Sequence, residues 1–239
     1  MALCTFRRSG KLKERERSPN LANKQRGALL TIAAGDHADF VELGAASRAA
    51  FCHHNELANI VVSNPPDTGR PVSWAKIPLI TGLLSQYDVV LALDADAVIV
   101  RSKVSIKGLV TRVRPIAMVA HKYMSQTVPN LGMFAVQRSY LVSRLLLKMW
   151  EQEDLIHHKW WENAAFLRLA GYDISSEPIS KVRRTTLDLR TNWLNGQWNS
   201  IPIAPVDNRI IKHYPGMSYD DRICRIKQDV EDWKRSGCP

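Results

Sequence analysis

Short apolar runs alternate with amphipathic segments along most of the chain. The clearest run is Tyr87–Leu93, seven mostly aliphatic residues that lead directly into Asp94-Ala95-Asp96. A short apolar run bounded by polar residues is typical of a strand that is buried on both faces. We predict further strands at Ala28–Gly35, Ala58–Ser63, Ile116–Ala120, Gly132–Val136 and Arg209–His213.

Apolar residues at helical spacing mark the segments between these strands. In one of them Ile77, Ile80 and Leu84 recur at intervals of three and four residues. Pro78 lies near the first turn of that segment, where a helix tolerates proline. We predict helices at Ala38–Ala50, Trp74–Gln86, Ser139–Gln152, Lys159–Ala170 and Tyr219–Lys234.

The alternation of strands and helices defines a fold class. It predicts an α/β fold in which a mainly parallel sheet carries helices on both faces. In such sheets ligands bind beyond the carboxyl ends of the strands. We therefore expect functional residues directly after Tyr87–Leu93.

The positive charge of the chain is unevenly distributed. The 239 residues include 33 Lys and Arg against 23 Asp and Glu, which gives a formal charge of +10. Residues 1–26 contribute +6 and contain few apolar residues, so we expect a basic, disordered tail there. Residues 27–239 contribute only +4 and form the expected folded domain.

Composition excludes several classes of protein. No stretch approaches the roughly 18–20 consecutive apolar residues that a membrane span needs. The tail also lacks the apolar segment that forms the centre of a signal peptide. Four scattered cysteines form neither a disulfide framework nor a CxxC zinc motif. The basic charge leaves a nucleic-acid-binding module as an alternative, but the body contains no helix-turn-helix, RRM or zinc-finger signature. We therefore expect no nucleic-acid partner.

Asp94 and Asp96 carry the strongest chemical signal. Carboxylates at positions i and i+2 of a strand end point to the same side, where they repel each other unless a cation lies beside them. Oxygen ligands of this kind suit Mg²⁺ or Mn²⁺, which commonly bridge to phosphates. The alternative is that the pair is an ordinary turn or helix cap at the end of a strand.

Five blocks of the sequence resemble a known family in the expected order. The strand Tyr87–Ala97 is similar to the Asp-x-Asp strand of GT-A-fold, nucleotide-sugar-dependent glycosyltransferases. The nearest resemblance is to fungal α-1,2-galactosyltransferases and α-1,6-mannosyltransferases and to plant xyloglucan xylosyltransferases. The other blocks are Trp74–Leu79, Asn130–Val136, Trp160–Ala165 and Ile211–Gly216. The resemblance implies a GT-A, Rossmann-like domain over residues 27–239.

The resemblance also implies roles for individual residues. Asp94, Asp96 and His213 would hold the metal, and the imidazole favours Mn²⁺ over Mg²⁺. Glu162 and Asn163 would be catalytic, although the family usually has Gln where this chain has Asn163. The residues implied in donor binding are Lys76, Asp94, Asn130 and Gly132.

The activity implied is that of a metal-dependent retaining glycosyltransferase. Its co-substrate would be a nucleotide-sugar, UDP- rather than GDP-linked, and its acceptor a glycan or glycoconjugate. A catalytically inactive relative is the second alternative. Eukaryotic relatives are Golgi membrane proteins, so a membrane anchor would lie outside this chain; otherwise we expect a cytoplasmic enzyme.

Two aromatic groups are further candidates for contact with a sugar. Trp160 and Trp161 form either an aromatic wall or helix packing. The adjacent pairs His53-His54 and His157-His158 lack the spacing of a helical zinc site, and we assign them no role. A second cluster, a candidate donor or acceptor lip, contains Trp193, Asn195, Trp198 and Asn199.

Overall fold

A computed structural model describes residues 26–123, 126–175 and 179–238. The predicted basic tail, residues 1–26, lies outside the described residues except for Arg26. The backbone N–H of Arg26 donates a hydrogen bond to Asp88 Oδ2 over 3.0 Å, at the start of the folded domain.

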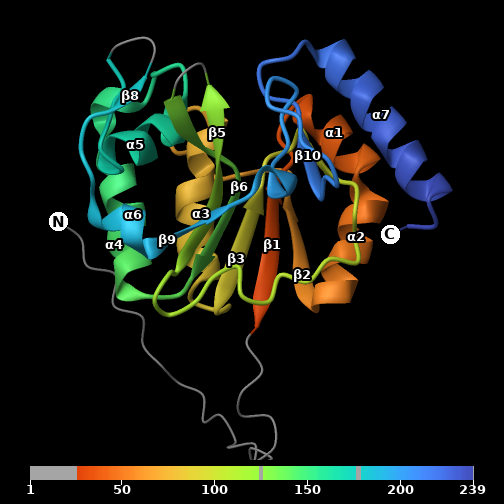
Figure 1. Cartoon of the computed structure of the whole chain (residues 1–239), viewed down its shortest axis with the longest axis horizontal. Helices are drawn as coiled ribbons and strands as arrows, with labels where there is room; N and C mark the ends of the chain where they lie inside the picture. The colour runs from red at the N-terminus through yellow and green to blue at the C-terminus, as the bar shows by residue number, and fades with distance from the viewer. Residues whose placement is uncertain (1–25, 124–125, 176–178, 239) are drawn as a thin grey trace, which may run out of the picture.

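A six-stranded sheet is the centre of the described part of the chain (Figure 1), with the strand order β2-β1-β3-β6-β5-β9. The pairs β1–β2, β1–β3 and β5–β9 are parallel, whereas β6 runs antiparallel to both of its neighbours. The prediction of a mainly parallel sheet is confirmed, with β6 as the reversed strand. The bounds are β1 Gly27–Ile32, β2 Leu57–Val62, β3 Val89–Leu93, β5 Ile116–Tyr123, β6 Gln126–Gln137 and β9 Thr191–Leu194.

Helices cover both faces of this sheet, as predicted (Figure 1): α3, α4 and α5 lie on one side, and α1, α2 and α7 on the other. The predicted helix Ala38–Ala50 is two helices, α1 and α2, which meet at Gly44. Glycine has a low helix propensity, which explains the break. The bounds are α1 His37–Leu43, α2 Ala45–Asn55, α3 Lys76–Leu83, α4 Tyr140–Trp150, α5 Trp161–Leu169, α6 Thr186–Arg190 and α7 Tyr219–Arg235. Among the described residues, no helix has the length and apolar character to cross a membrane.

The central strand β3 supplies side chains to two hydrophobic cores. Val90 and Ala92 pack in the core beneath α3, α4 and α5, whereas Leu91 and Leu93 pack in the core beneath α2. This alternation follows from the two-residue period of a strand. With both faces buried, the strand is held firmly and its carboxyl end becomes a fixed platform.

A second, two-stranded sheet lies beyond that platform. β4 (Ala97–Ile99) pairs antiparallel with β10 (Ile211–His213), and His213 is in register with Ala97. This pairing brings the C-terminal part of the chain beside the end of β3. A further small sheet joins β7 (Tyr172–Asp173) to β8 (Ser180–Lys181).

Candidate active site

Asp94 and Asp96 lie in the turn between β3 and β4. The backbone N–H of Asp94 donates to Gly132 O over 2.9 Å, which ties the turn to β6, and that of Ala97 donates to Asp94 O over 3.1 Å. The Asp94 side chain is 32% exposed and that of Asp96 12%. The first carboxylate is therefore accessible to a ligand, while the second is mostly covered.

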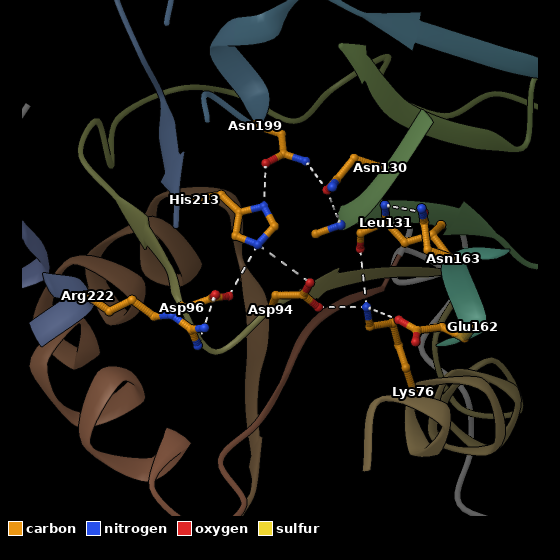
Figure 2. A network of polar contacts seen from close by, with 11 residues as sticks. Lys76, Asp94, Asp96, Asn130, Leu131, Glu162, Asn163, Asn199, His213 and Arg222 are labelled. Atoms are coloured by element: carbon orange, nitrogen blue, oxygen red, sulfur yellow. Dashed lines mark hydrogen bonds and ion pairs between the residues drawn. The ribbon is translucent and has the colours of Figure 1, made fainter. Parts of the chain in front are cut away.

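His213 completes a group of three potential metal ligands (Figure 2). Its Nε2 atom lies 3.2 Å from Asp96 Oδ1 and 3.7 Å from Asp94 Oδ2. One ligand atom from each of the three side chains lies within 4.8 Å of the others. Two carboxylates and an imidazole are a donor set that fits a divalent cation such as Mn²⁺.

Two asparagines fix the orientation of the His213 ring. The side-chain nitrogen of Asn199 donates to Asn130 Oδ1 over 2.8 Å, which leaves Asn199 Oδ1 to face His213 Nδ1 at 3.0 Å. His213 therefore donates through Nδ1 and turns Nε2 toward the carboxylates. A metal-ligating histidine is commonly oriented by such an outer hydrogen bond.

The site is strongly polarised without any added ion. Burial raises the pKa of Asp96, but His213 and Arg222 outweigh this effect and lower that pKa to about 2. Burial lowers the pKa of His213, but the carboxylates of Asp96 and Asp94 outweigh it and raise that pKa above its ordinary value. These carboxylates thus attract positive charge, in agreement with the chemistry expected of them.

Gly132 permits the close approach of β6 and β10. A Cβ atom at this position would lie 2.2 Å from His213 Cε1 and 2.3 Å from Nδ1, so only glycine fits beside the ring. The register between β5 and β6 shifts here, because Met118 faces Phe134 whereas the next residue, Val119, faces Asn130. This irregularity lets β6 bulge and places Asn130 within the histidine network.

Lys76 connects two predicted parts of the site. It is the first residue of α3, and its Nζ lies 2.6 Å from Asp94 Oδ1 and 2.8 Å from Glu162 Oε1. Burial lowers the pKa of Lys76, but the two carboxylates outweigh it and raise that pKa above its ordinary value. Lys76 is consequently a buried cation that links α3 to β3 and α5.

Glu162 and Asn163, in the first turn of α5, make different contacts. Glu162 is 4% exposed; burial raises its pKa, and Asp94 adds to the shift while Lys76 opposes it. Asn163 Oδ1 accepts from Leu131 N over 3.1 Å, and its Nδ2 donates to Pro129 O over 3.4 Å. The structure thus joins Glu162 to the carboxylate network and Asn163 to the backbone of β6. Their predicted catalytic roles stay predictions.

Two side chains of the site were not predicted. Arg222, on α7, places a guanidinium nitrogen 3.5 Å from Asp96 Oδ2 and lies over the ring of Phe40. His121, on β5, is buried, and its Nε2 has no hydrogen-bond partner among the described residues. Burial lowers the pKa of His121 to about 4, and His213 adds to this shift. Nothing in the sequence around either residue signals these positions.

The remaining aromatic and amide candidates lie in different settings. Trp160 is partly buried and its ring lies tilted against that of His158, with the ring centroids 5.6 Å apart, while Trp161 is 45% exposed and has a positive φ of 44°. In the second cluster, Asn195 caps the short 3-10 helix Gly196–Trp198, Trp198 is buried, and Asn199 contacts His213. Of that cluster, Asn199 is therefore joined directly to the metal-ligand group.

The fold is similar to those of several solved glycosyltransferase structures. It resembles a glycosyltransferase involved in glycosylation of the major capsid of PBCV-1, with a TM-score of 0.63 and 11% identity over 85% of this chain and 99% of that one. It also resembles the galactosyltransferase LgtC, with a TM-score of 0.51 and 13% identity over 87% of this chain and 99% of that one. The glycosyltransferase GlyE of Streptococcus pneumoniae TIGR4 gives a TM-score of 0.52 and 10% identity, covering 90% and 64%.

The fold is that of GT-A glycosyltransferases, and it carries its acidic pair and histidine at the end of the central strand. No protein-family model matches the sequence. No curated protein matches it either. At identities this low, the similarity defines the fold alone, and the activity depends on the residues of the site.

Proposed function

We propose that this protein is a metal-dependent retaining glycosyltransferase that moves a sugar from a nucleotide-sugar to a hydroxyl group of a glycan or glycoconjugate. One observation carries the proposal: Asp94, Asp96 and His213 converge at the carboxyl end of β3 in a GT-A fold. Ligand binding at this edge of the sheet is the general rule for open α/β folds. The retaining outcome and the UDP-linked donor rest on the family resemblance of the five sequence blocks.

The same three side chains would hold the metal, with Mn²⁺ favoured over Mg²⁺ because of the imidazole. A divalent cation bound there would neutralise charge on the nucleoside diphosphate that leaves. Asn199 keeps Nε2 of His213 turned toward the carboxylates. The closeness of Gly132 to that ring leaves no room for a side chain on this wall. These contacts support a preorganised donor site.

Lys76 and Glu162 support a second role, next to the metal ligands. Lys76 holds Asp94 on one side and Glu162 on the other, so it positions both carboxylates. Glu162 is the proposed carboxylate for orienting the acceptor or stabilising positive charge on the sugar. Glu162 is paired with Lys76 whereas Asp96 is paired with His213, so the two carboxyl groups have different partners and suit different tasks.

A thermal-shift screen of UDP- and GDP-sugars, each with and without Mn²⁺, tests the donor and the metal together. We expect a UDP-sugar with Mn²⁺ to raise the melting temperature more than either does alone, because a ligand that binds the native state stabilises it. A donor-hydrolysis assay should then show slow cleavage that Mn²⁺ stimulates.

Substitutions of the proposed metal ligands test whether the Mn²⁺-dependent cleavage takes place at this site. Asp96→Ala and His213→Ala should abolish the Mn²⁺-dependent shift and the cleavage, whereas Asp67→Ala, in an exposed loop, should leave both unchanged. Cleavage that persists in Asp96→Ala and His213→Ala would contradict the proposed metal site. If no nucleotide-sugar stabilises the folded protein, the result would favour the alternative that this chain is a catalytically inactive relative of glycosyltransferases.

A further inference from the structure

A groove lies between α7 and the segment that leads into β10, away from the metal ligands. It has a volume of about 370 Å³, which is within the range of small-molecule sites. Figure 1 shows α7 at the edge of the molecule, and the contact of Lys212 with Asp229 joins β10 to this helix. The lining includes Ile201, Lys212 and Tyr214 on one side and Arg225, Gln228 and Asp229 of α7 on the other.

The groove has an excess of positive charge. Its one acidic side chain among the described residues, Asp229, accepts from Lys212 through Oδ1 and from Tyr214 through Oδ2. Arg209 and Arg225 have no carboxylate within ion-pair distance in the described part of the chain; Arg209 donates through Nε to Val206 O over 2.6 Å. Two guanidinium groups therefore line the groove without an ion-pair partner among the described residues.

Three apolar side chains also line the groove. Ile201, Pro202 and Pro205 face the groove from the segment that precedes β10. Apolar surface of this kind packs against the body of a small molecule, next to polar groups that fix its orientation. Guanidinium groups are the side chains best suited to oxyanions, because they offer several N–H donors in one plane.

The groove is separate from the metal ligands. Lys212 lines it, whereas the next residue, His213, turns toward Asp94 and Asp96; successive side chains of a strand point to opposite faces. Arg222, which reaches Asp96, does not line the groove. The strand β10 thus has a metal-binding face and a groove face.

We propose that this groove is a second binding site, for a sugar-sized molecule that carries a phosphate group. Arg209 and Arg225 bind the phosphate, and the three apolar side chains pack against the body of the ligand. The site goes beyond the proposed function and does not depend on it, because neither arginine touches the metal ligands.

The test uses the full chain without metal and three probes: inorganic phosphate, glucose 6-phosphate and glucose. NMR titration should shift the backbone amide signals of Ile201, Lys212 and Gln228 with glucose 6-phosphate, less with phosphate and not with glucose. Arg225→Gln, at an exposed position, should weaken binding about tenfold, as expected when one charged hydrogen bond is lost. The matched control is Lys227→Gln, on the exposed surface of the same helix and outside the groove, and it should change nothing.

A second pair of variants separates the groove from the donor site. Arg209→Gln combined with Arg225→Gln should remove binding, while Arg222→Gln should retain it. The opposite pattern would place the phosphate beside Asp96 and overturn the proposal, as would the absence of saturable binding by the wild-type chain. If Mn²⁺ fails to bind at Asp94 and Asp96 but phosphate still shifts the groove signals, the proposed function fails and this inference stands.

Discussion

The candidate site has two halves that share Asp94 and differ in how their charges are balanced. On one side Lys76 joins Asp94 and Glu162, and both members of the Lys76–Glu162 pair are almost completely buried. On the other side Asp94, Asp96 and His213 gather around a space that is partly open at Asp94. In the first half the buried cation Lys76 lies within 2.8 Å of both carboxylates, whereas in the second half Asp96 lies 3.2 Å from His213 and 3.5 Å from Arg222.

This difference separates a structural requirement from a binding capacity. A buried charge needs a partner, so substitutions in the Lys76 half should lower the stability of the fold whether or not a ligand is bound. The His213 half holds two carboxylates that a cation would stabilise, so its variants should change metal affinity more than folding. Four variants test this contrast, in order of decreasing effect.

Lys76→Met should have the largest effect, on stability. It leaves Glu162 buried without its cation, and breaking a buried pair in this way costs about 3–5 kcal/mol of unfolding free energy. Chemical denaturation measures the change, and Lys148→Met, an exposed position on α4, serves as the control. Equal stability of the two variants would show that the Lys76 half is not a structural requirement.

Asp96→Asn should mainly affect metal binding. Removing one unit of charge next to a divalent cation costs a few kcal/mol, so the affinity for Mn²⁺ should fall by about a hundredfold or more. Calorimetric titration with Mn²⁺ gives this value, and Asp67→Asn is the exposed control. If Asp96→Asn instead destabilises the fold as strongly as Lys76→Met, the contrast between the halves is lost.

Gly132→Ala should have an intermediate effect. The added methyl group would overlap the His213 ring, so the ring or β6 has to move. We expect a loss of about 1–3 kcal/mol in stability, the usual cost of overpacking, with weaker Mn²⁺ binding. Gly82→Ala on α3 is the matched control, because a Cβ there meets no atom within 4 Å. An unchanged Mn²⁺ affinity in Gly132→Ala would show that the position of the His213 ring does not affect metal binding.

Arg222→Gln should have the smallest effect and the opposite sign. The guanidinium lies 3.5 Å from Asp96 and competes with a cation for that carboxylate. Its removal should strengthen Mn²⁺ binding by about twofold to fivefold, since partly exposed ion pairs contribute about 1 kcal/mol or less. Arg235→Gln, which removes an exposed ion pair on the same helix, is the control. Weaker Mn²⁺ binding in Arg222→Gln would mean that the arginine positions Asp96.

The parts of the fold that were predictable depend on local pattern. The run Tyr87–Leu93 identified β3 and the acidic pair at its end, because burial on both faces leaves an apolar signature in the sequence. β4 and β9 were not predicted, since three or four residues are too few for a period to appear. The direction of β6 is decided by its pairing with β5 and β3, which no local pattern encodes.

The site was predictable residue by residue but not as a network. Lys76 and Glu162 were both named as candidates, yet their contact joins positions 86 residues apart and follows only from the packing of α3 and α5. His213 was identified through its resemblance to a family block. Arg222 and His121 were missed because a single charged residue on a helix or strand has no distinguishing pattern around it.

The pairing of β10 with β4 also determines when the site can form during synthesis. All six strands of the central sheet precede residue 195, whereas His213 and Arg222 come later in the chain. Contacts between distant positions form only after the intervening chain has been made. A nascent chain released before residue 211 would thus contain every strand of the sheet and the acidic pair, but not the imidazole. In such a chain Asp94 and Asp96 would lie side by side without His213 or Arg222, so the three-ligand group would be incomplete.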